Sequence, residues 1–222
     1  MPTSPTSSTS ADTSTTRGSS RDPRVRRTRA LLRTAVLELA MEKDLDGITM
    51  GDIAERAQVN RATVYLHYKD REDLLLDATE STMEGVLEAA RACRLTADAQ
   101  ELSPDATPVH LVRLFDHVHR HRAVYRRMLG EDGSPRFAAR LERLLAQAWS
   151  EQLRAEAGSG RPDEGALLVQ AHFLSGAVLS VIGRWTRGDF DTSAGDGRDR
   201  ADGMSTERVA GLTWSLIAGR PR

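Results

Sequence analysis

The segment from Thr49 to Tyr68 most constrains how this chain folds, because it predicts two short helices joined by a tight turn. Its first half carries apolar residues at the spacing of one helix face, and these are Met50, Ile53, Ala54 and Ala57. Thr49 is the expected N-cap, since a threonine hydroxyl accepts a hydrogen bond from a backbone N–H group at a helix start. The apolar pattern breaks at Gln58 and restarts at Arg61, so Asn60 is expected to cap the second helix.

The second helix of this pair carries polar and aromatic residues where a core helix would carry aliphatic ones. Val59 and Val64 are expected to pack back on the first helix. The remaining side chains are expected to face outward or to bridge, and they belong to Arg61, Ala62, Thr63, Tyr65, His67 and Tyr68. An exposed helix of this composition suits a groove of DNA, where such side chains reach phosphates and base edges.

These residues resemble the helix-turn-helix of TetR-family transcription regulators, over roughly Thr28 to Asp77. The matching positions are Thr49, Ile53-Ala54, Gln58-Val59, Thr63-Val64-Tyr65-Leu66-His67-Tyr68, Lys69 and Leu74-Leu75. Two positions depart from the family pattern, because Gln58 replaces a frequent turn glycine and Asp44 replaces a frequent glycine that closes the first helix. Both positions are expected to require a positive φ angle, which Asp tolerates better than Gln, so strain is expected at Gln58.

The resemblance implies that the helix from Arg61 to Tyr68 enters a major groove of double-stranded DNA. The exposed start of this helix supplies the candidate base contacts, which are Arg61, Ala62 and Thr63. By resemblance, phosphate contacts are expected from Thr49, Tyr65, His67, Lys69 and Arg71, together with Arg24 and Arg27 of the basic N-terminal segment. Asn60 and Tyr68 complete the candidate DNA-binding residues.

The distribution of charge supports this interpretation, although the formal net charge is only −1. Residues 17–71 contain twelve basic and eight acidic residues, whereas residues 72–222 contain nineteen basic and twenty-three acidic residues. An arginine run alone is more often a solvated tail. Because this run adjoins the helix-turn-helix, it is expected to meet phosphates.

The rest of the chain is predicted to be helical, because no segment shows the alternation of a strand with a hairpin signal. The expected helices are Thr28–Lys43, Arg71–Arg94, Pro108–Leu129, Arg136–Ala157, Asp163–Arg187 and Ser205–Ala218. The predicted fold is all-α, with a three-helix DNA-binding domain at residues 23–75 and a ligand-binding and dimerisation domain at residues 76–222. Residues 1–22, rich in Ser and Thr, are expected to form a disordered tail.

The last two helices are expected to form the interface of a homodimer, as a four-helix bundle across a two-fold axis. Their apolar stripes are Leu167, Leu168, Ala171, Leu174, Ser175, Val178, Leu179 and Ile182, and Val209, Leu212, Thr213, Leu216 and Ile217. The alternative is that both helices belong to the core of a monomer. The sequence pattern fits both alternatives, but binding to a palindrome requires a dimer.

A small-molecule effector is expected to bind among the middle helices, because the resemblance implies regulation by such a ligand. The candidate pocket residues are Phe115, Tyr125, Trp149, His172 and Trp185, although each is more often plain packing. Two segments, Leu114 to His121 and Leu174 to Ala177, with Trp185, weakly resemble regulators of dihydroxyacetone kinase operons. That resemblance identifies no ligand.

Three other functions compete with DNA binding as interpretations of this sequence. His117 and His121 have the spacing of a two-histidine metal site, but no further ligand pattern completes it and the neighbouring arginines would repel a cation. Cys93 has no histidine near it in sequence, and the chain lacks a glycine-rich phosphate loop, so neither an enzyme nor a cofactor is predicted. The third alternative is a TetR-like co-regulator that acts through protein contacts without its own operator.

The predicted function is therefore a DNA-binding repressor that a small-molecule effector releases from a palindromic operator. A cytoplasmic location is expected, since the single cysteine forms no intramolecular disulfide. No apolar run is expected to reach the roughly 20 residues that span a membrane. The sequence does not identify the operator or the effector.

Overall fold

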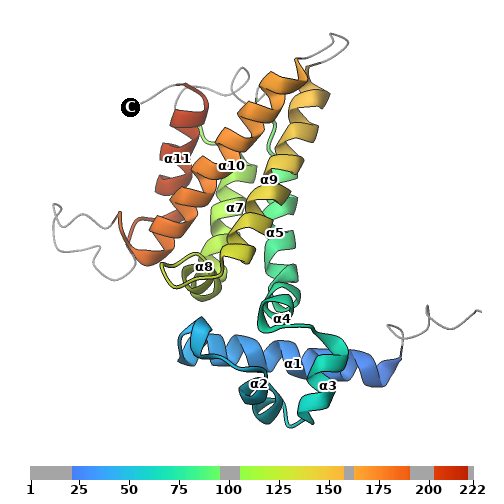
Figure 1. Ribbon diagram of the computed structural model, residues 1–222. Helices are drawn as coiled ribbons and strands as arrows, with labels where there is room; N and C mark the ends of the chain where they lie inside the picture. The colour runs from blue at the N-terminus through green and yellow to red at the C-terminus, as the bar shows by residue number, and fades with distance from the viewer. Residues whose placement is uncertain (1–21, 96–105, 158–162, 191–202, 220–222) are drawn as a thin grey trace, which may run out of the picture.

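The computed structural model describes residues 22–95, 106–157, 163–190 and 203–219, and within these ranges the chain is helical without a strand (Figure 1). The predicted all-α fold is therefore confirmed. Except for Asp22, the predicted disordered tail lies outside the described residues. Three helices pack at the N-terminal end, and a bundle of helices stands above them in Figure 1, with α4 (Arg71–Ala78) between the two groups.

The first helix, α1 (Pro23–Glu42), begins earlier than expected because Asp22 caps it and Pro23 favours its first position. The Asp22 carboxylate accepts a hydrogen bond from the backbone N–H of Arg24 at 2.8 Å, and Pro23 takes the first helical position, which tolerates proline. Its apolar residues recur at helical spacing and are buried, and they are Leu32, Ala35, Val36, Leu39 and Ala40. The basic residues Arg24 and Arg27 therefore lie on a helix and not in a tail.

Two further short helices, α2 (Met50–Arg56) and α3 (Arg61–His67), form the predicted helix-turn-helix. A short 3₁₀ turn, Leu45–Gly47, leads into it. Thr49 Oγ1 accepts a hydrogen bond from the Asp52 N–H at 3.1 Å, and the Asp52 carboxylate accepts one from the Thr49 N–H at 2.9 Å. Asn60 Oδ1 accepts a hydrogen bond from the Ala62 N–H at 2.8 Å. Both predicted caps are thus confirmed.

The two predictions of a positive φ angle have different outcomes. Asp44 has a φ angle of −61°, so the prediction for that position was wrong. The chain leaves α1 through Lys43 in an extended conformation, and no left-handed residue is needed there. Gln58 has a φ angle of 55°, as predicted, and it is a non-glycine residue in the left-handed region.

Replacing Gln58 with glycine is expected to stabilise the protein by about 0.5–1 kcal/mol, because glycine relieves the left-handed strain and loses only part of that gain to unfolded-state entropy. The free energy of unfolding, measured in urea, tests this expectation. Glu55→Gly is the matched control, since it places glycine on the exposed face of α2, where it is expected to destabilise. A loss of stability in both variants would contradict the strain at Gln58.

The C-terminal bundle contains α5 (Glu80–Arg91), α7 (Val109–Arg120), α8 (Arg122–Met128), α9 (Pro135–Glu156), α10 (Glu164–Arg187) and α11 (Thr206–Ile217). Two helices that were predicted as single elements are broken. The segment Arg71–Arg94 breaks at Thr79, whose hydroxyl donates to the Leu75 and Leu76 carbonyls and competes with helical hydrogen bonds. The segment Pro108–Leu129 breaks at His121, and Pro108 is the N-cap residue of α7, not its first helical residue.

The break at His121 allows Arg122 to reach the end of α10. Its guanidinium donates hydrogen bonds to the carbonyl oxygens of Thr186 at 2.9 Å and of Trp185 at 3.3 Å. These carbonyls belong to the last turn of α10, where backbone acceptors lack helical partners and where a positive charge is favourable. The break thus has a tertiary cause that helical periodicity does not reveal.

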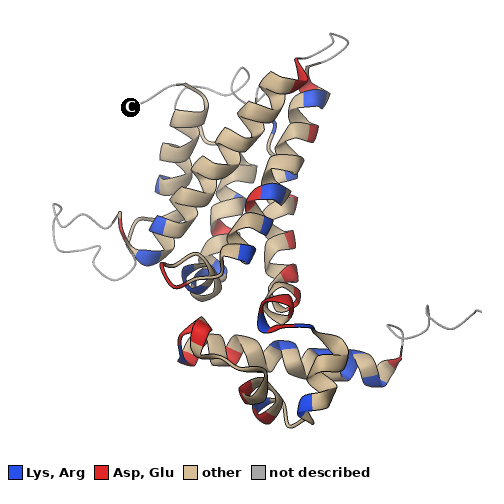
Figure 2. Cartoon of the chain, in the orientation of Figure 1, with Lys and Arg blue, Asp and Glu red and all other residues tan. Residues whose placement is uncertain are grey.

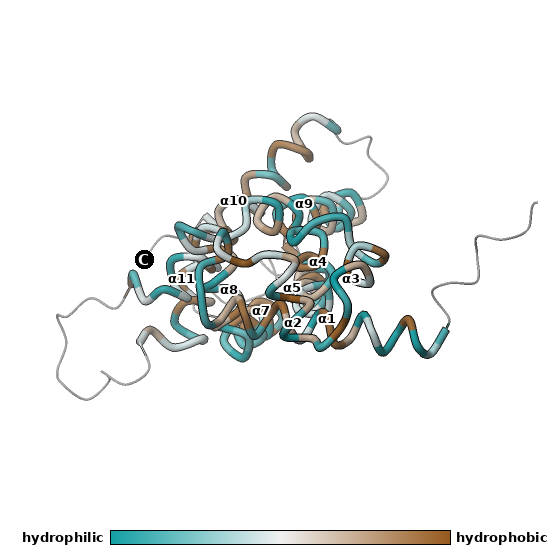
Figure 3. Tube along the Cα trace, turned by 60° about the horizontal axis from the view of Figure 1, so that its bottom comes forward, coloured by the Kyte–Doolittle hydropathy of each residue, from teal (hydrophilic) through white to brown (hydrophobic). Residues whose placement is uncertain are grey.

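The apolar residues of α10 and α11 are divided between the core and the surface. Five residues of the predicted interface stripe on α10 are buried inside the protomer, and they are Ala171, Leu174, Ser175, Val178 and Ile182. Hydrophobic side chains on the other face are exposed, and they include Leu168, Val169 and Phe173 of α10 and Leu212 and Leu216 of α11. Figure 3 shows hydrophobic residues along α10 at the surface of the bundle.

The apolar helix α10 corrects the expectation that no apolar run is long enough to span a membrane. By length and composition, this helix would be long enough to cross a membrane. In the structure it packs against α9 over much of its length, as a helix of a bundle does.

Candidate nucleic-acid interface

The short helix α3 is held by two buried residues and presents the rest of its surface outward. Val64 and Tyr68, the C-cap residue, face the protein interior. Arg61, Ala62 and Tyr65 are exposed, and Thr63 and His67 are partly exposed. The predicted DNA-facing residues of α3 therefore lie on one accessible surface, with the exception of Tyr68.

Tyr68 was predicted to face outward or to bridge, and the structure favours the second alternative, because only 3% of the residue is exposed. Its hydroxyl donates a hydrogen bond to Asp77 and accepts one from Arg29 Nε at 3.1 Å. Arg29 also pairs with Asp77 at 3.2 Å. Burial and the hydrogen bond to Asp77 raise the pKa of Tyr68 to about 12, so the hydroxyl keeps its proton. Tyr68 thus anchors α3 to α1 and α4.

Arg71 was expected to contact a phosphate, but the structure gives its guanidinium other partners. It donates hydrogen bonds to the carbonyl oxygens of Leu45 and Ile48, the second at 3.4 Å. It also pairs with Asp46 at 3.1 Å, and its side chain is 21% exposed. Arg71 therefore holds the segment between α1 and α2, because its guanidinium joins two carbonyl groups and one carboxylate of that segment.

The other predicted phosphate contacts remain at the surface. Figure 2 shows basic residues along the first part of α1 and on α3. Arg24, Arg27 and Lys69 are exposed. Arg61 lies over the ring of Tyr65, with 5.8 Å between the guanidinium carbon and the ring centroid. The combination of positive charge and exposed aromatic groups suits a polyanion.

Thr49 and Asn60 are also exposed, but each side chain already caps a helix. These two side chains therefore stabilise the N-termini of α2 and α3, whose free backbone N–H groups can bind an anion. Asp52, the partner of Thr49, lies beside Lys43 at 2.7 Å. The hydrogen bond from Lys43, followed by those from Thr49, lowers the pKa of Asp52 to about 2. The capping box is thus ionised at neutral pH.

Comparison with known proteins identifies the family to which this chain corresponds. Residues 32–78 match the family model described as bacterial regulatory proteins, tetR family, and residues 108–199 match the model of a transcriptional regulator C-terminal region. The chain belongs to the TetR family. Membership of this family makes it a regulator and not an enzyme.

Relatives of this TetR-family chain agree with the assignment. An uncharacterized HTH-type transcriptional regulator of Bacillus subtilis (strain 168), YxbF, is 32% identical over 108 residues, which are 49% of this chain and 28% of the relative. The match to a second such regulator from the same organism, YdeS, covers 30% of that relative. The chain thus spans less than a third of the length of these curated relatives.

Two solved structures show the same fold at low sequence identity. A TetR transcriptional regulator from Streptococcus agalactiae 2603V has a TM-score of 0.59 at 18% identity, covering 89% of this chain and 97% of its own. The dihydroxyacetone kinase operon activator DhaS has a TM-score of 0.50 at 13% identity, covering 87% and 95% respectively. At these identities the likeness concerns the fold alone.

Contacts that the sequence did not reveal join the DNA-binding end of this TetR-family protein to its C-terminal bundle. Arg136 of α9 pairs with Asp70 at 3.0 Å, and the Ser134 hydroxyl donates to Glu72 at 2.5 Å. Arg127 of α8 donates to the carbonyl oxygen of Lys43 at 2.6 Å. Asp70 follows α3 by three residues, so these contacts fix the position of α3 relative to α9.

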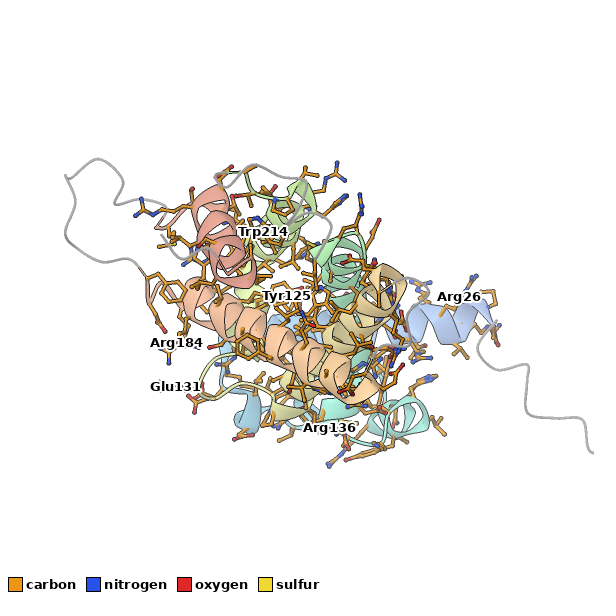
Figure 4. All side chains as sticks on the ribbon, turned by 90° about the horizontal axis from the view of Figure 1, so that it is seen from above. Arg26, Tyr125, Glu131, Arg136, Arg184 and Trp214 are labelled. Carbon is orange, nitrogen blue, oxygen red and sulfur yellow. The ribbon has the colours of Figure 1, made fainter. Side chains whose placement is uncertain are left out.

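The residues expected to line an effector pocket do not all lie together. Phe115, Tyr125, Trp149 and Trp185 are buried in the bundle, and Figure 4 shows Tyr125 in the middle of the helices. Burial raises the pKa of Tyr125, whose hydroxyl donates to the Thr82 carbonyl at 2.9 Å.

His172 was expected in the same pocket, but it lies on the exposed side of α10. Its Nδ1 is 3.7 Å from the carboxylate of Glu142. The helix turns His172 away from the core because Ala171 and Leu174 occupy the inner face.

The expected pocket residues line neither of two surface grooves. One groove, of about 300 Å³, lies between the end of α1 and α8. The other, of about 430 Å³, lies between the α8–α9 connection and α10. Trp149 Nε1 is buried without a hydrogen-bond partner in the structure.

The histidine pair at the end of α7 is engaged in packing. The His117 and His121 rings lie 4.6 Å apart, and His117 Nε2 is 2.8 Å from the Thr82 carbonyl, to which it must donate. Burial lowers the pKa of His117. The ring also fills the space where a side chain at Gly85 would lie. Within the described residues no group of three or more possible metal ligands gathers.

Proposed function

We propose that this TetR-family protein is a DNA-binding transcriptional regulator that recognises a palindromic operator as a homodimer. The observation that carries the proposal is the surface of α3, where Arg61, Ala62, Thr63 and Tyr65 face outward while Val64 and Tyr68 hold the helix in place. A short helix that is anchored on one face and open on the other can enter a major groove. In this role Arg61, Ala62 and Thr63 contact base edges.

Phosphate contacts come from residues on either side of α3. Lys69, Tyr65 and His67 lie at the accessible surface of α3 and the residues after it. Arg24 and Arg27 lie on α1, whose N-terminal part extends away from the bundle at Arg26 in Figure 4. These residues are placed to follow the DNA backbone beyond the groove that α3 occupies. Arg71 and Tyr68 act indirectly, by fixing the position of α3.

The homodimer is formed by α10 and α11. Their exposed faces combine large apolar residues, such as Phe173 and Leu216, with the exposed small residues Gly176 and Ala177. Contiguous apolar surface of this kind marks an interaction site, and small residues let two helices approach closely. A two-fold axis through this face gives two copies of α3, one for each half of a palindrome.

Regulation follows from the division into a DNA-binding domain at residues 23–75 and a second domain at residues 76–222. The boundary falls inside α4, so α4 transmits movement between the domains. An effector that binds among Phe115, Tyr125, Trp149 and Trp185 changes the position of α3 through the contacts of Arg136 and Ser134, which couple the two sites in free energy. Repression is the proposed mode, in the cytoplasm, with release of the operator by the effector. DhaS, named as an activator, shares only the fold.

Selection of bound duplexes from a random DNA pool tests the proposal, at about 150 mM salt, near physiological ionic strength. Recovery of a palindrome, with affinity that falls steeply as salt rises, would support a dimeric operator-binding protein. Failure of a folded dimer to enrich any sequence would favour the alternative, a TetR-like co-regulator that acts through protein contacts.

Replacing Lys69 with alanine is expected to weaken binding to all sequences alike. The slope of log affinity against log salt is expected to become shallower by about 1 for each protomer, because one phosphate contact is lost per half-site. Mobility shifts at a series of salt concentrations measure this slope. Arg120→Ala is the matched control, since it removes one exposed positive charge from α7. Equal slopes for Lys69→Ala and the unmodified protein would exclude Lys69 as a phosphate contact.

A further inference from the structure

Leu66 is the most exposed of the large hydrophobic residues that the structure describes, with 82% of its surface accessible. It lies two residues after the buried Val64 and two residues before the buried Tyr68. At 3.6 residues per turn, successive side chains are about 100° apart, so Leu66 points away from the face that these two residues bury. Leu66 is therefore at the outermost line of α3.

Two smaller apolar groups share this outer line. Ala62 and Thr63 lie four and three residues before Leu66, which puts all three on one side of the helix. Tyr65 and His67 occupy the two flanks. Arg61 lies at the flank as well, because its Nη2 atom is 3.5 Å from the Tyr65 hydroxyl. The centre of the outward surface is thus a methyl and isobutyl cluster, bordered by polar and charged groups.

Single exposed leucines are common and need no explanation by themselves. Leu66 differs from such residues in its position, because it lies opposite the anchored face of α3. The same end of the molecule carries the exposed basic residues Arg24, Arg27 and Lys69. That charge is complementary to a nucleic acid. Among the groups on base edges in the major groove, the C5-methyl of thymine is the apolar one.

We propose that Leu66, together with Ala62 and Thr63, reads thymine methyl groups in each half-site of the operator. This inference rests on the proposed function and adds the chemistry that α3 selects. The operator then contains at least one thymine per half-site whose methyl group contributes to affinity. Leu66 determines specificity through apolar contact, whereas Arg61 contributes a hydrogen-bonding group beside it.

A combined substitution of protein and DNA tests the inference. In the operator recovered by selection, each thymine of a half-site is replaced in turn by deoxyuridine, at symmetric positions, which removes only the methyl group. The dissociation constants of the unmodified protein and of Leu66→Ala are then measured on both duplexes. At one position the unmodified protein is expected to bind the uracil duplex about 4-fold more weakly per half-site, the effect of one buried methyl-sized group. Leu66→Ala is expected to bind both duplexes equally.

Controls separate the contact from effects on folding. Leu66→Gln keeps a side chain of comparable size and replaces its apolar end with an amide, so it is expected to lose the discrimination in the same way. Val109→Ala removes an exposed aliphatic side chain from α7 and is expected to retain full discrimination. Circular dichroism of each variant checks that α3 and the rest of the fold are intact.

Two results would overturn the inference while leaving the proposed function in place. One is an operator in which no thymine methyl contributes to binding, or in which the half-sites hold no thymine. The other is equal discrimination by Leu66→Ala and the unmodified protein. Failure to recover any operator would instead overturn the proposed function and this inference together.

Discussion

Replacing Phe173 with aspartate is expected to convert the protein to a monomer and to weaken operator binding by at least about 100-fold. Phe173 lies on α10 with 73% of its surface exposed, so the substitution leaves the packing of the protomer intact. In the proposed dimer the same position is covered by the partner subunit. An uncompensated charge buried there costs about 3–5 kcal/mol of dimerisation free energy, which is 100-fold or more in the dissociation constant.

Sedimentation equilibrium and mobility shifts on the selected operator measure the two effects. Val109→Asp is the matched control, because it introduces the same charge at an exposed apolar residue outside α10 and α11. That control is expected to remain a dimer. A dimeric Phe173→Asp variant would exclude this face of α10 as the interface, and a monomer that keeps full affinity would exclude dimeric recognition.

Replacing Arg71 with alanine is expected to lower the free energy of unfolding by about 2–3 kcal/mol. The guanidinium supplies charge-assisted hydrogen bonds to the Leu45 and Ile48 carbonyls, and each such bond contributes roughly 1.5–3 kcal/mol in favourable cases. Their loss leaves the Leu45 carbonyl with the Ile48 N–H and removes the Arg71 donor from the Ile48 carbonyl. Operator binding is expected to fall because α2 and α3 are less well held.

Urea unfolding and salt titration together distinguish the role of Arg71 from that of Lys69. For Arg71→Ala, stability is expected to fall while the salt slope of binding by the folded protein stays the same. Arg113→Ala, at an exposed arginine on α7, is the control for loss of charge. An unchanged stability with a shallower salt slope would restore the phosphate contact that the family resemblance implied for Arg71.

The sequence predicted those features that depend on neighbouring residues. The caps at Thr49 and Asn60 involve partners within three positions, so residue type and spacing suffice to find them. The left-handed Gln58 follows from the need for a tight turn between two short helices. The buried stripe of α1 follows from helical periodicity.

Long-range partners explain where the structure gives side chains other partners than the sequence indicated. Tyr68 is of a residue type that often contacts DNA. Arg29 and Asp77, which are distant along the chain, form hydrogen bonds with its hydroxyl and hold the side chain inside the protein. Arg71 has the charge of a phosphate contact, but in the structure its guanidinium donates hydrogen bonds to the carbonyls of Leu45 and Ile48. The local pattern of residues reveals none of these partners, because they lie far away along the chain.

The sequence by itself thus determined the all-α class, the helix-turn-helix and its caps, because these depend on periodicity and on contacts within one turn. Only the tertiary structure decided which side of α10 is core, where the long helices break, and how Arg136 and Ser134 join the bundle to α4. The physical reason is that an apolar or charged side chain has no preferred partner until packing brings distant segments together. The same packing leaves Leu66 outermost on α3.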